Sequence, residues 1–224
     1  MNRNNVSVLD RRTESALATN KVLRNTYMLL GMTFLFSAFT AYASLAIHAR
    51  PLNPLIFIVG VYGLMFLTNA LKNSVWGLVS VFAFTGFMGY ALGPILSYYI
   101  ASFSNGPKLI ATALGGTGLI FFALSGYALT TRKDFSYLGG FLFVGVMVAF
   151  LGMIASIFFS IPALSLGISA LFVLISSGLI LFQTSEIIHG GETNYISATV
   201  SLFVSIYNLF LSLLNLLGAF SGKE

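Results

Sequence analysis

The chain has 224 residues, of which 57% are hydrophobic and 8% are charged, and its formal net charge is +5. Soluble domains carry charge on about a quarter of their residues, so this composition excludes a soluble globular protein. The sequence contains no cysteine, which excludes disulfide bonds and thiol chemistry. An ionised side chain at mid-bilayer costs roughly 3 kcal/mol, and here the charged residues fall between long uncharged stretches. This pattern predicts an all-α polytopic membrane protein.

Residues 1–24 are predicted to form a polar tail ahead of a transmembrane domain at 25–220. Apolar residues are too sparse in the tail for a packed core, so we expect at most a short amphipathic helix leading into the first span. The apolar run that follows is longer than the roughly 7–15 residues of a signal-peptide core. We therefore expect no cleavage there.

Seven spans are predicted, each long enough to cross a hydrocarbon core of roughly 30 Å. They are apolar on every face, which favours helices over barrel strands. Pro94 lies in a stretch too short for two crossings and predicts one helix kinked near Gly93 and Pro94. Pro162 divides a stretch too long for one crossing. The spans lie within 25–47, 51–71, 73–107, 109–131, the two parts of 135–185, and 195–217.

The short loops predict the orientation of the chain. With the N-terminus in the cytoplasm, the inner side carries most of the lysines and arginines, as the positive-inside rule requires. The C-terminus then lies outside. The net positive charge is thus a topology signal, and no nucleic-acid partner is predicted, because the basic residues do not cluster on one solvated face. The inner set is Arg3, Arg11, Arg12, Lys21, Arg24, Lys72, Arg132 and Lys133, and the outer set is Arg50, Lys108 and Lys223.

Glycines inside the predicted spans allow helix backbones to approach closely in lipid. Gly86, Gly89 and Gly93 share one face of the third span, and Gly152 with Ser156 repeats this spacing in the fifth. The cluster of glycines at 115–118 is expected to do the same in the fourth. We interpret all three sets as helix-packing surfaces.

Few residues could perform chemistry. An intramembrane serine protease needs a base within about 3 Å of its serine, but the serines of the spans, such as Ser125 and Ser176, are far from the two histidines at the span ends, His48 and His189. Two distant histidines and a few carboxylates make a thin metal-ligand set. No catalytic residue, metal site or cofactor is predicted.

The last two spans carry the polar residues that are candidates for function. Gln183 and Glu186 share one face of the sixth span. A polar stripe in a membrane helix normally points into the bundle, so the seventh span is predicted to be interior, either for interhelical hydrogen bonding alone or for conduction. His189 either titrates near neutral pH or is simply solvated. Gly190 and Gly191 are expected to end the sixth helix and Asn194 to cap the seventh. The stripe consists of Ser205, Asn208, Ser212 and Asn215.

These segments resemble the Bax inhibitor-1 family. The likeness to its last two helices lies in Phe182-x-Thr184-x-x-Ile187-Ile188, Asn194-Tyr195-Ile196 and the run from Leu202 to Leu214, and Gly89-Tyr90-x-Leu92-Gly93-Pro94 and Leu138-Gly139-Gly140 extend it. Residues 21–27, 62–68 and 187–195 are more narrowly similar to YccA-type proteins of the bacterial inner membrane.

The resemblance implies seven helices with the last one surrounded by the other six. The YccA-type branch is known for binding and modulating the membrane-anchored ATP-dependent protease FtsH, so the resemblance implies a non-catalytic regulator, with FtsH and membrane lipid as partners. It also implies an alternative, a pH-sensitive calcium leak that depends on paired aspartates in helices six and seven. Gln183 and Ser205 occupy those positions here, and neither can ionise. The regulator is therefore the favoured hypothesis.

Overall fold

A computed structural model describes the backbone of residues 3–158 and 162–222, and the side chains of these residues except 3–20, 157–158 and 162. Within the described residues the chain forms seven helices, and all seven are long and apolar enough to cross a membrane. The seven-span, all-α prediction is confirmed. The helices are α1 (Arg3–Ala46), α2 (Pro54–Leu71), α3 (Trp76–Ser102), α4 (Gly106–Thr131), α5 (Leu138–Phe158), α6 (Pro162–His189) and α7 (Tyr195–Phe220).

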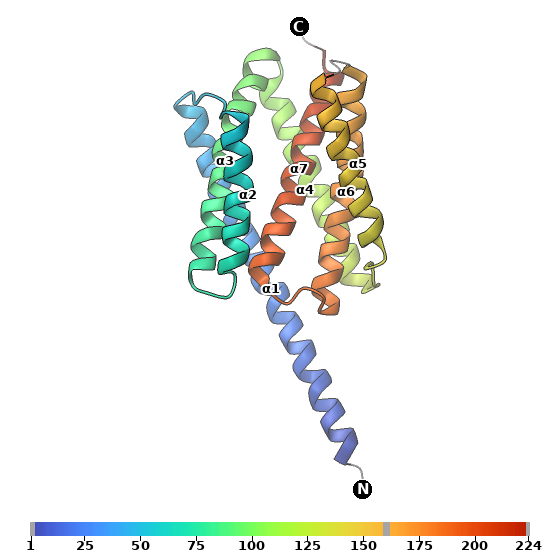
Figure 1. Cartoon of the computed structure of the whole chain (residues 1–224). Coiled ribbons are helices and arrows are strands. Elements are labelled where there is room, and N and C mark those ends of the chain that lie inside the picture. The colour runs from blue at the N-terminus through green and yellow to red at the C-terminus, as the bar shows by residue number, and fades with distance from the viewer. Residues whose placement is uncertain (1–2, 159–161, 223–224) are drawn as a thin grey trace.

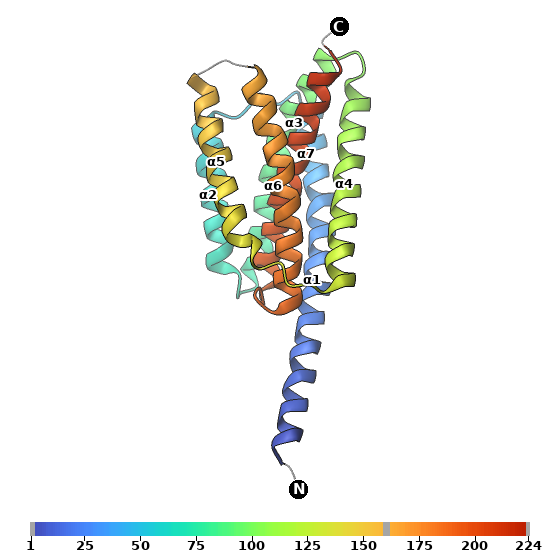
Figure 2. The ribbon, with the colours of Figure 1, turned by 90° about the vertical axis from the view of Figure 1, so that its right-hand side faces the viewer.

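Helix α1 begins much earlier than its predicted span. It is one helix of 44 residues, and its N-terminal part projects from the end of the bundle in both views (Figures 1 and 2). No glycine or proline occurs before Gly31, so nothing in the sequence interrupts the helix between the tail and the membrane. The prediction of at most a short amphipathic helix ahead of the span was therefore wrong.

Prolines and caps set the other helix ends. Pro94 lies inside the single helix α3, as predicted, whereas the bend expected there stays a prediction. Helix α6 begins at Pro162, and the break predicted before it falls on residues 159–161, outside the described residues. Asn194 caps α7, because its side-chain oxygen accepts hydrogen bonds from the backbone N–H groups of Ile196 and Ser197. Gly190, with a φ of 79°, follows the end of α6.

Helix α7 is the central element of the bundle (Figure 1). More than half of its most apolar window, 56%, is buried, and Leu202, Phe203 and Leu209 are fully enclosed. It packs against α1, α2, α3, α4 and α6, but among the described residues α5 packs only against α6. The last helix is therefore surrounded by five helices and not by the six that the resemblance implied. Helix α5 is so apolar that lipid can cover it without a second protein neighbour.

The predicted glycine face of α3 packs against α1. A Cβ atom at Gly86 would collide with the ring of Phe36, one at Gly89 with the backbone oxygen of Ser37, and one at Gly93 with Ser44. These contacts confirm close helix packing. Gly152 likewise lies close to Ile168 of α6.

The glycines of α4 behave differently. A Cβ atom at Gly115 or Gly118 would meet nothing within 4 Å, and one at Gly116 would meet only Leu213, at an ordinary 3.6 Å. The prediction that they bring helices together was wrong, because a side chain would fit at each of these three glycines without a collision.

Candidate functional site

The polar stripe of α7 makes hydrogen bonds to α6 at two levels. Ser205 is buried, and its hydroxyl oxygen lies 3.2 Å from Oε1 of Gln183 and 3.0 Å from the backbone oxygen of Ser201. Near the other end of the helix, the amide nitrogen of Asn215 donates to Oγ of Ser169 at 2.9 Å. Both contacts join neutral groups, so the stripe contributes interhelical hydrogen bonds without any buried charge.

Gln183 and Ser205 therefore form an amide–hydroxyl pair where the resemblance implied two aspartates. The single hydroxyl proton of Ser205 can point at only one of its two oxygen neighbours at a time. When the proton points at Ser201, the hydroxyl oxygen is free to accept a hydrogen bond. No proton is gained or lost in either arrangement.

A groove runs along the side of α7 between α2 and α6. Its volume is about 570 Å³, and its floor is the first three turns of α7, visible between α2 and α6 in Figure 1. Helices α2 and α6 do not pack against each other in the described part of the chain, which leaves the groove open toward the lipid. The lining residues are Tyr62, Met65, Phe66, Thr68, Asn69, Leu179, Gln183, Ser197, Val200, Ser201, Val204 and Ser205.

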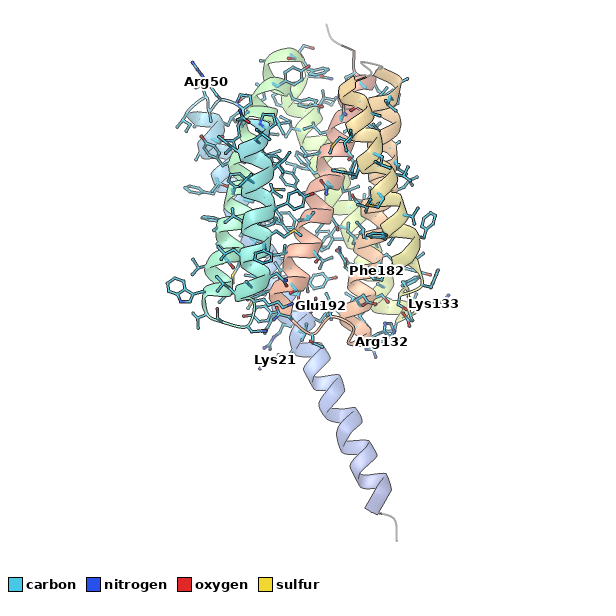
Figure 3. The ribbon with its side chains drawn as sticks, viewed as in Figure 1. Lys21, Arg50, Arg132, Lys133, Phe182 and Glu192 are labelled. Atoms are coloured by element: carbon cyan, nitrogen blue, oxygen red, sulfur yellow. The ribbon has the colours of Figure 1, made fainter. Side chains whose placement is uncertain are left out.

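Two smaller hollows also lie beside α7. One of about 210 Å³ shares Gln183 and Ser201 with the groove and adds the carboxylates of Glu186 and Glu192. Figure 3 shows Glu192 at the end of the bundle from which α1 projects. The second hollow, of about 220 Å³, contains Ser212 and Asn215 beside α5 and α6.

Two other predicted site residues lie apart from these hydrogen bonds. Asn208 is half-buried, lines none of the three hollows, and its amide makes no hydrogen bond to a described residue. Glu186 is half-buried, and its carboxylate lies so close to Gly191 that a Cβ atom there would collide with it. No group of three or more His, Asp or Glu side chains lies together among the described residues.

His189 contacts the connection between α4 and α5. Its Nδ1 lies 2.9 Å from the backbone oxygen of Ser185, and its Nε2 lies 3.1 Å from the backbone oxygen of Arg132. Ser185 is fully buried, its Oγ accepts a hydrogen bond from the backbone N–H of Phe135, and it lies 3.3 Å from the backbone oxygen of Lys133. Ser185 was not among the predicted site residues; it lies four residues before His189, on the same helix face.

Replacing Ser185 with alanine is expected to destabilise the folded protein by about 1–3 kcal/mol, because the buried N–H of Phe135 loses its acceptor. Thermal unfolding of the purified protein in detergent micelles measures the effect. Ser156→Ala is the matched control, since among the described residues that hydroxyl bonds only to Met153 of its own helix. Equal melting temperatures for Ser185→Ala and the unmodified chain would show that the contact contributes nothing.

Asp134 stabilises the same connection through a local turn. Its carboxylate accepts a hydrogen bond from the backbone N–H of Ser136 at 2.9 Å, and this bond holds the pKa of Asp134 below its usual value. The stabilisation of the fold by Asp134 is therefore present above the pKa that Asp134 has in the unfolded chain. It is lost as the pH falls through the lowered pKa of Asp134 in the folded chain.

The chain matches a known protein family and several bacterial proteins over most of its length. A family model described as inhibitor of apoptosis-promoting Bax1 matches residues 19–222. The chain is 58% identical over 210 residues to the modulator of FtsH protease YccA of Escherichia coli K12, covering 94% of each chain. The same identity and coverage hold for a protein named inner membrane protein YccA in E. coli O6:H1. An uncharacterized protein of Pseudomonas aeruginosa is 52% identical over 203 residues, 91% of each chain.

Proposed function

Because the chain belongs to the Bax inhibitor-1 family, we propose that it binds and modulates the membrane-anchored protease FtsH without any catalysis of its own. One observation carries this proposal: the likeness to a protein named modulator of FtsH protease extends over 94% of both chains. The family model matches residues 19–222, which include the membrane-spanning parts of all seven helices. The proposed location is the bacterial inner membrane.

We further propose that the N-terminus lies in the cytoplasm and the C-terminus on the outer side. The two termini lie at opposite ends of the bundle (Figure 1). Lys21, Arg132 and Lys133 lie at the end from which α1 projects, and Arg50 lies at the other end (Figure 3). This distribution supports the orientation, because cytoplasmic loops carry the excess of lysine and arginine.

The projecting part of α1 is the segment at which we expect FtsH to start unfolding the chain. In this orientation the helix formed by residues 3–20 stands in the cytoplasm (Figure 2). Most helical stability in proteins comes from tertiary packing, and this part of α1 projects beyond the packed bundle. An ATP-driven protease could therefore unfold it at low cost and use it as a handle.

Deleting residues 2–12 tests this proposal. The shortened chain is expected to insert normally, since its spans are intact, but to be degraded more slowly by FtsH and to change the degradation of other FtsH substrates. Pulse-chase labelling with and without FtsH measures both rates. The matched control replaces residues 2–12 with an unrelated polar segment of equal length, which should restore turnover if only a solvated handle is needed. If the deletion inserts and neither rate changes, the handle proposal fails.

A second candidate is a conduit for calcium or protons through the bundle. The polar stripe of α7, with hollows on its inner and outer halves, is the observation that favours it. Intramembrane ion pathways usually contain ionisable residues, however, and the spans of α6 and α7 offer only Glu186 and, at the end of α6, His189.

A further inference from the structure

We propose that the groove between α2, α6 and α7 is the docking site for one transmembrane helix of a partner protein. The docked helix would carry hydrogen-bonding side chains in its cytoplasmic half and a lysine or arginine at its cytoplasmic end. The inference rests on the proposed function only in that FtsH supplies the partner.

The wall formed by α2 suits a helix as its occupant. Only 6% of the apolar window of α2 is buried, far less than in α3 or α7. Three of its large side chains, Tyr62, Met65 and Phe66, line the groove and are 60%, 42% and 76% exposed. Helices in lipid associate through van der Waals packing, so a partner helix gains these contacts on docking.

The polar groups that line the groove favour a protein helix over a lipid chain as its occupant. The side chains of Asn69, Ser197 and Ser201 make no hydrogen bond to a described residue, and the amide nitrogen of Gln183 has no described acceptor. By contrast, the hydroxyl of Thr68, which also lines the groove, already donates a hydrogen bond to the backbone oxygen of Leu64. An acyl chain would leave these groups unpaired, whereas interhelical hydrogen bonds in membranes stabilise association by roughly 1 kcal/mol each.

The rim of the groove is negatively charged, which suits a lysine or arginine on the partner helix. Glu186 and Glu192 line the adjoining hollow, which shares Gln183 and Ser201 with the groove. Neither carboxylate forms an ion pair with a described side chain; Glu192 accepts only the backbone N–H of Asn194. Transmembrane helices commonly carry lysine or arginine just beyond their cytoplasmic ends. Such a residue on a docked helix would lie next to these carboxylates.

The extent of the floor indicates where the partner contacts α7. The floor runs from Ser197 to Ser205, about 12 Å along the helix axis at 1.5 Å per residue. This segment is the start of α7, on the proposed cytoplasmic half of the membrane. The polar side chains of the partner are therefore expected within its first or last two or three turns next to the cytoplasm.

Site-specific photo-crosslinking in cells tests the proposal. A benzophenone amino acid at Phe66 or Ser201 faces the groove, and the same residue at Leu119, which is 70% exposed on α4, is the control. We expect protease adducts from both groove positions, mapped to a membrane segment of FtsH, and none above background from Leu119. Adducts from the groove with lipid alone, or with a second copy of this chain, would overturn the proposal.

A groove-filling substitution provides an independent measurement. Ser201→Phe places a ring in the groove at an exposed position, so the fold is expected to be retained, and Ala123→Phe adds the same ring to an exposed position of α4. Co-purification of FtsH is expected to fall at least about fivefold in Ser201→Phe and to stay unchanged in Ala123→Phe. Equal co-purification by both variants would contradict the docking site.

The failure of this inference and the failure of the proposed function give different results. If FtsH co-purifies but is crosslinked equally from Leu119, the docking site is wrong and the proposed function stands. If the groove positions crosslink to the membrane helix of a different protein and FtsH is never captured, the docking site stands and the proposed function is wrong.

Discussion

Replacing Gly89 with leucine is expected to destabilise the folded bundle by at least about 3 kcal/mol, more than a typical overpacking substitution of about 1–3 kcal/mol. A Cβ atom at this position would collide with the backbone oxygen of Ser37 and with Oγ1 of Thr40. A backbone oxygen cannot move aside as a side chain can. Relief therefore requires α1 and α3 to separate along the most extensively packed helix pair of the protein.

Thermal unfolding in detergent micelles, followed by size-exclusion fluorescence, measures this loss. Gly115→Leu is the matched control, because a Cβ atom there meets nothing within 4 Å. The control should melt near the temperature of the unmodified chain, and Gly89→Leu should aggregate or melt well below it. Similar losses in both variants would show that the close approach of α1 and α3 does not determine stability.

The double variant Gln183→Asp with Ser205→Asp is expected to gain a pH-dependent calcium flux that the unmodified chain lacks. Ser205 Oγ and Gln183 Oε1 lie 3.2 Å apart, so two aspartates at these positions would be close enough to share one proton. Two carboxylates at such a distance change their charge with pH, whereas an amide and a hydroxyl do not. Flux into liposomes loaded with a calcium indicator, at acidic and at neutral pH, measures the gain.

The matched control is Gln183→Asn with Ser205→Asn, which has the shape of the aspartate pair without its charge. It should behave like empty vesicles. If the unmodified chain already conducts calcium in a pH-dependent way, and if Glu186→Gln weakens that flux, the conduit is supported and the proposal of a purely regulatory bundle is wrong.

The number of spans could be predicted from the sequence because the bilayer core excludes individual charged residues. Each charge has to lie near an aqueous end, so the gaps between charges give five of the spans directly, and Pro162 divides the one gap that is too long for a single crossing into the other two. The family resemblance based on residues 182–188 and 194–196 is confirmed by the family model that matches 19–222. The central place of α7 was also predictable, because its polar stripe needs hydrogen-bonding partners.

Features that depend on the surroundings of a helix were not predictable. Nothing in the apolar sequence of α5 indicates that, among the described residues, it packs only against α6. Gly89 and Gly115 both belong to glycine clusters inside a span, but only Gly89 has a helix against it. In lipid, an exposed face and a buried face have similar composition, so sequence alone does not separate them.

The candidate site was only partly predictable for the same reason. The pairing of Gln183 with Ser205 followed from motif positions in the resemblance, and the structure places the two side chains in contact. The groove beside them could not be predicted, because it exists only where α2 and α6 fail to meet. Ser185 was missed because nothing in the sequence marks a serine whose partners lie about 50 residues away.

The most direct test of the proposed function is proteolysis in a purified membrane system. FtsH is reconstituted into liposomes with a membrane-protein substrate, and the rate of substrate degradation is measured with and without this chain. We predict that the unmodified chain changes the rate in a dose-dependent way and that Ser201→Phe has a much weaker effect. Degradation at the same rate at every concentration of the correctly inserted, unmodified chain would contradict the proposal.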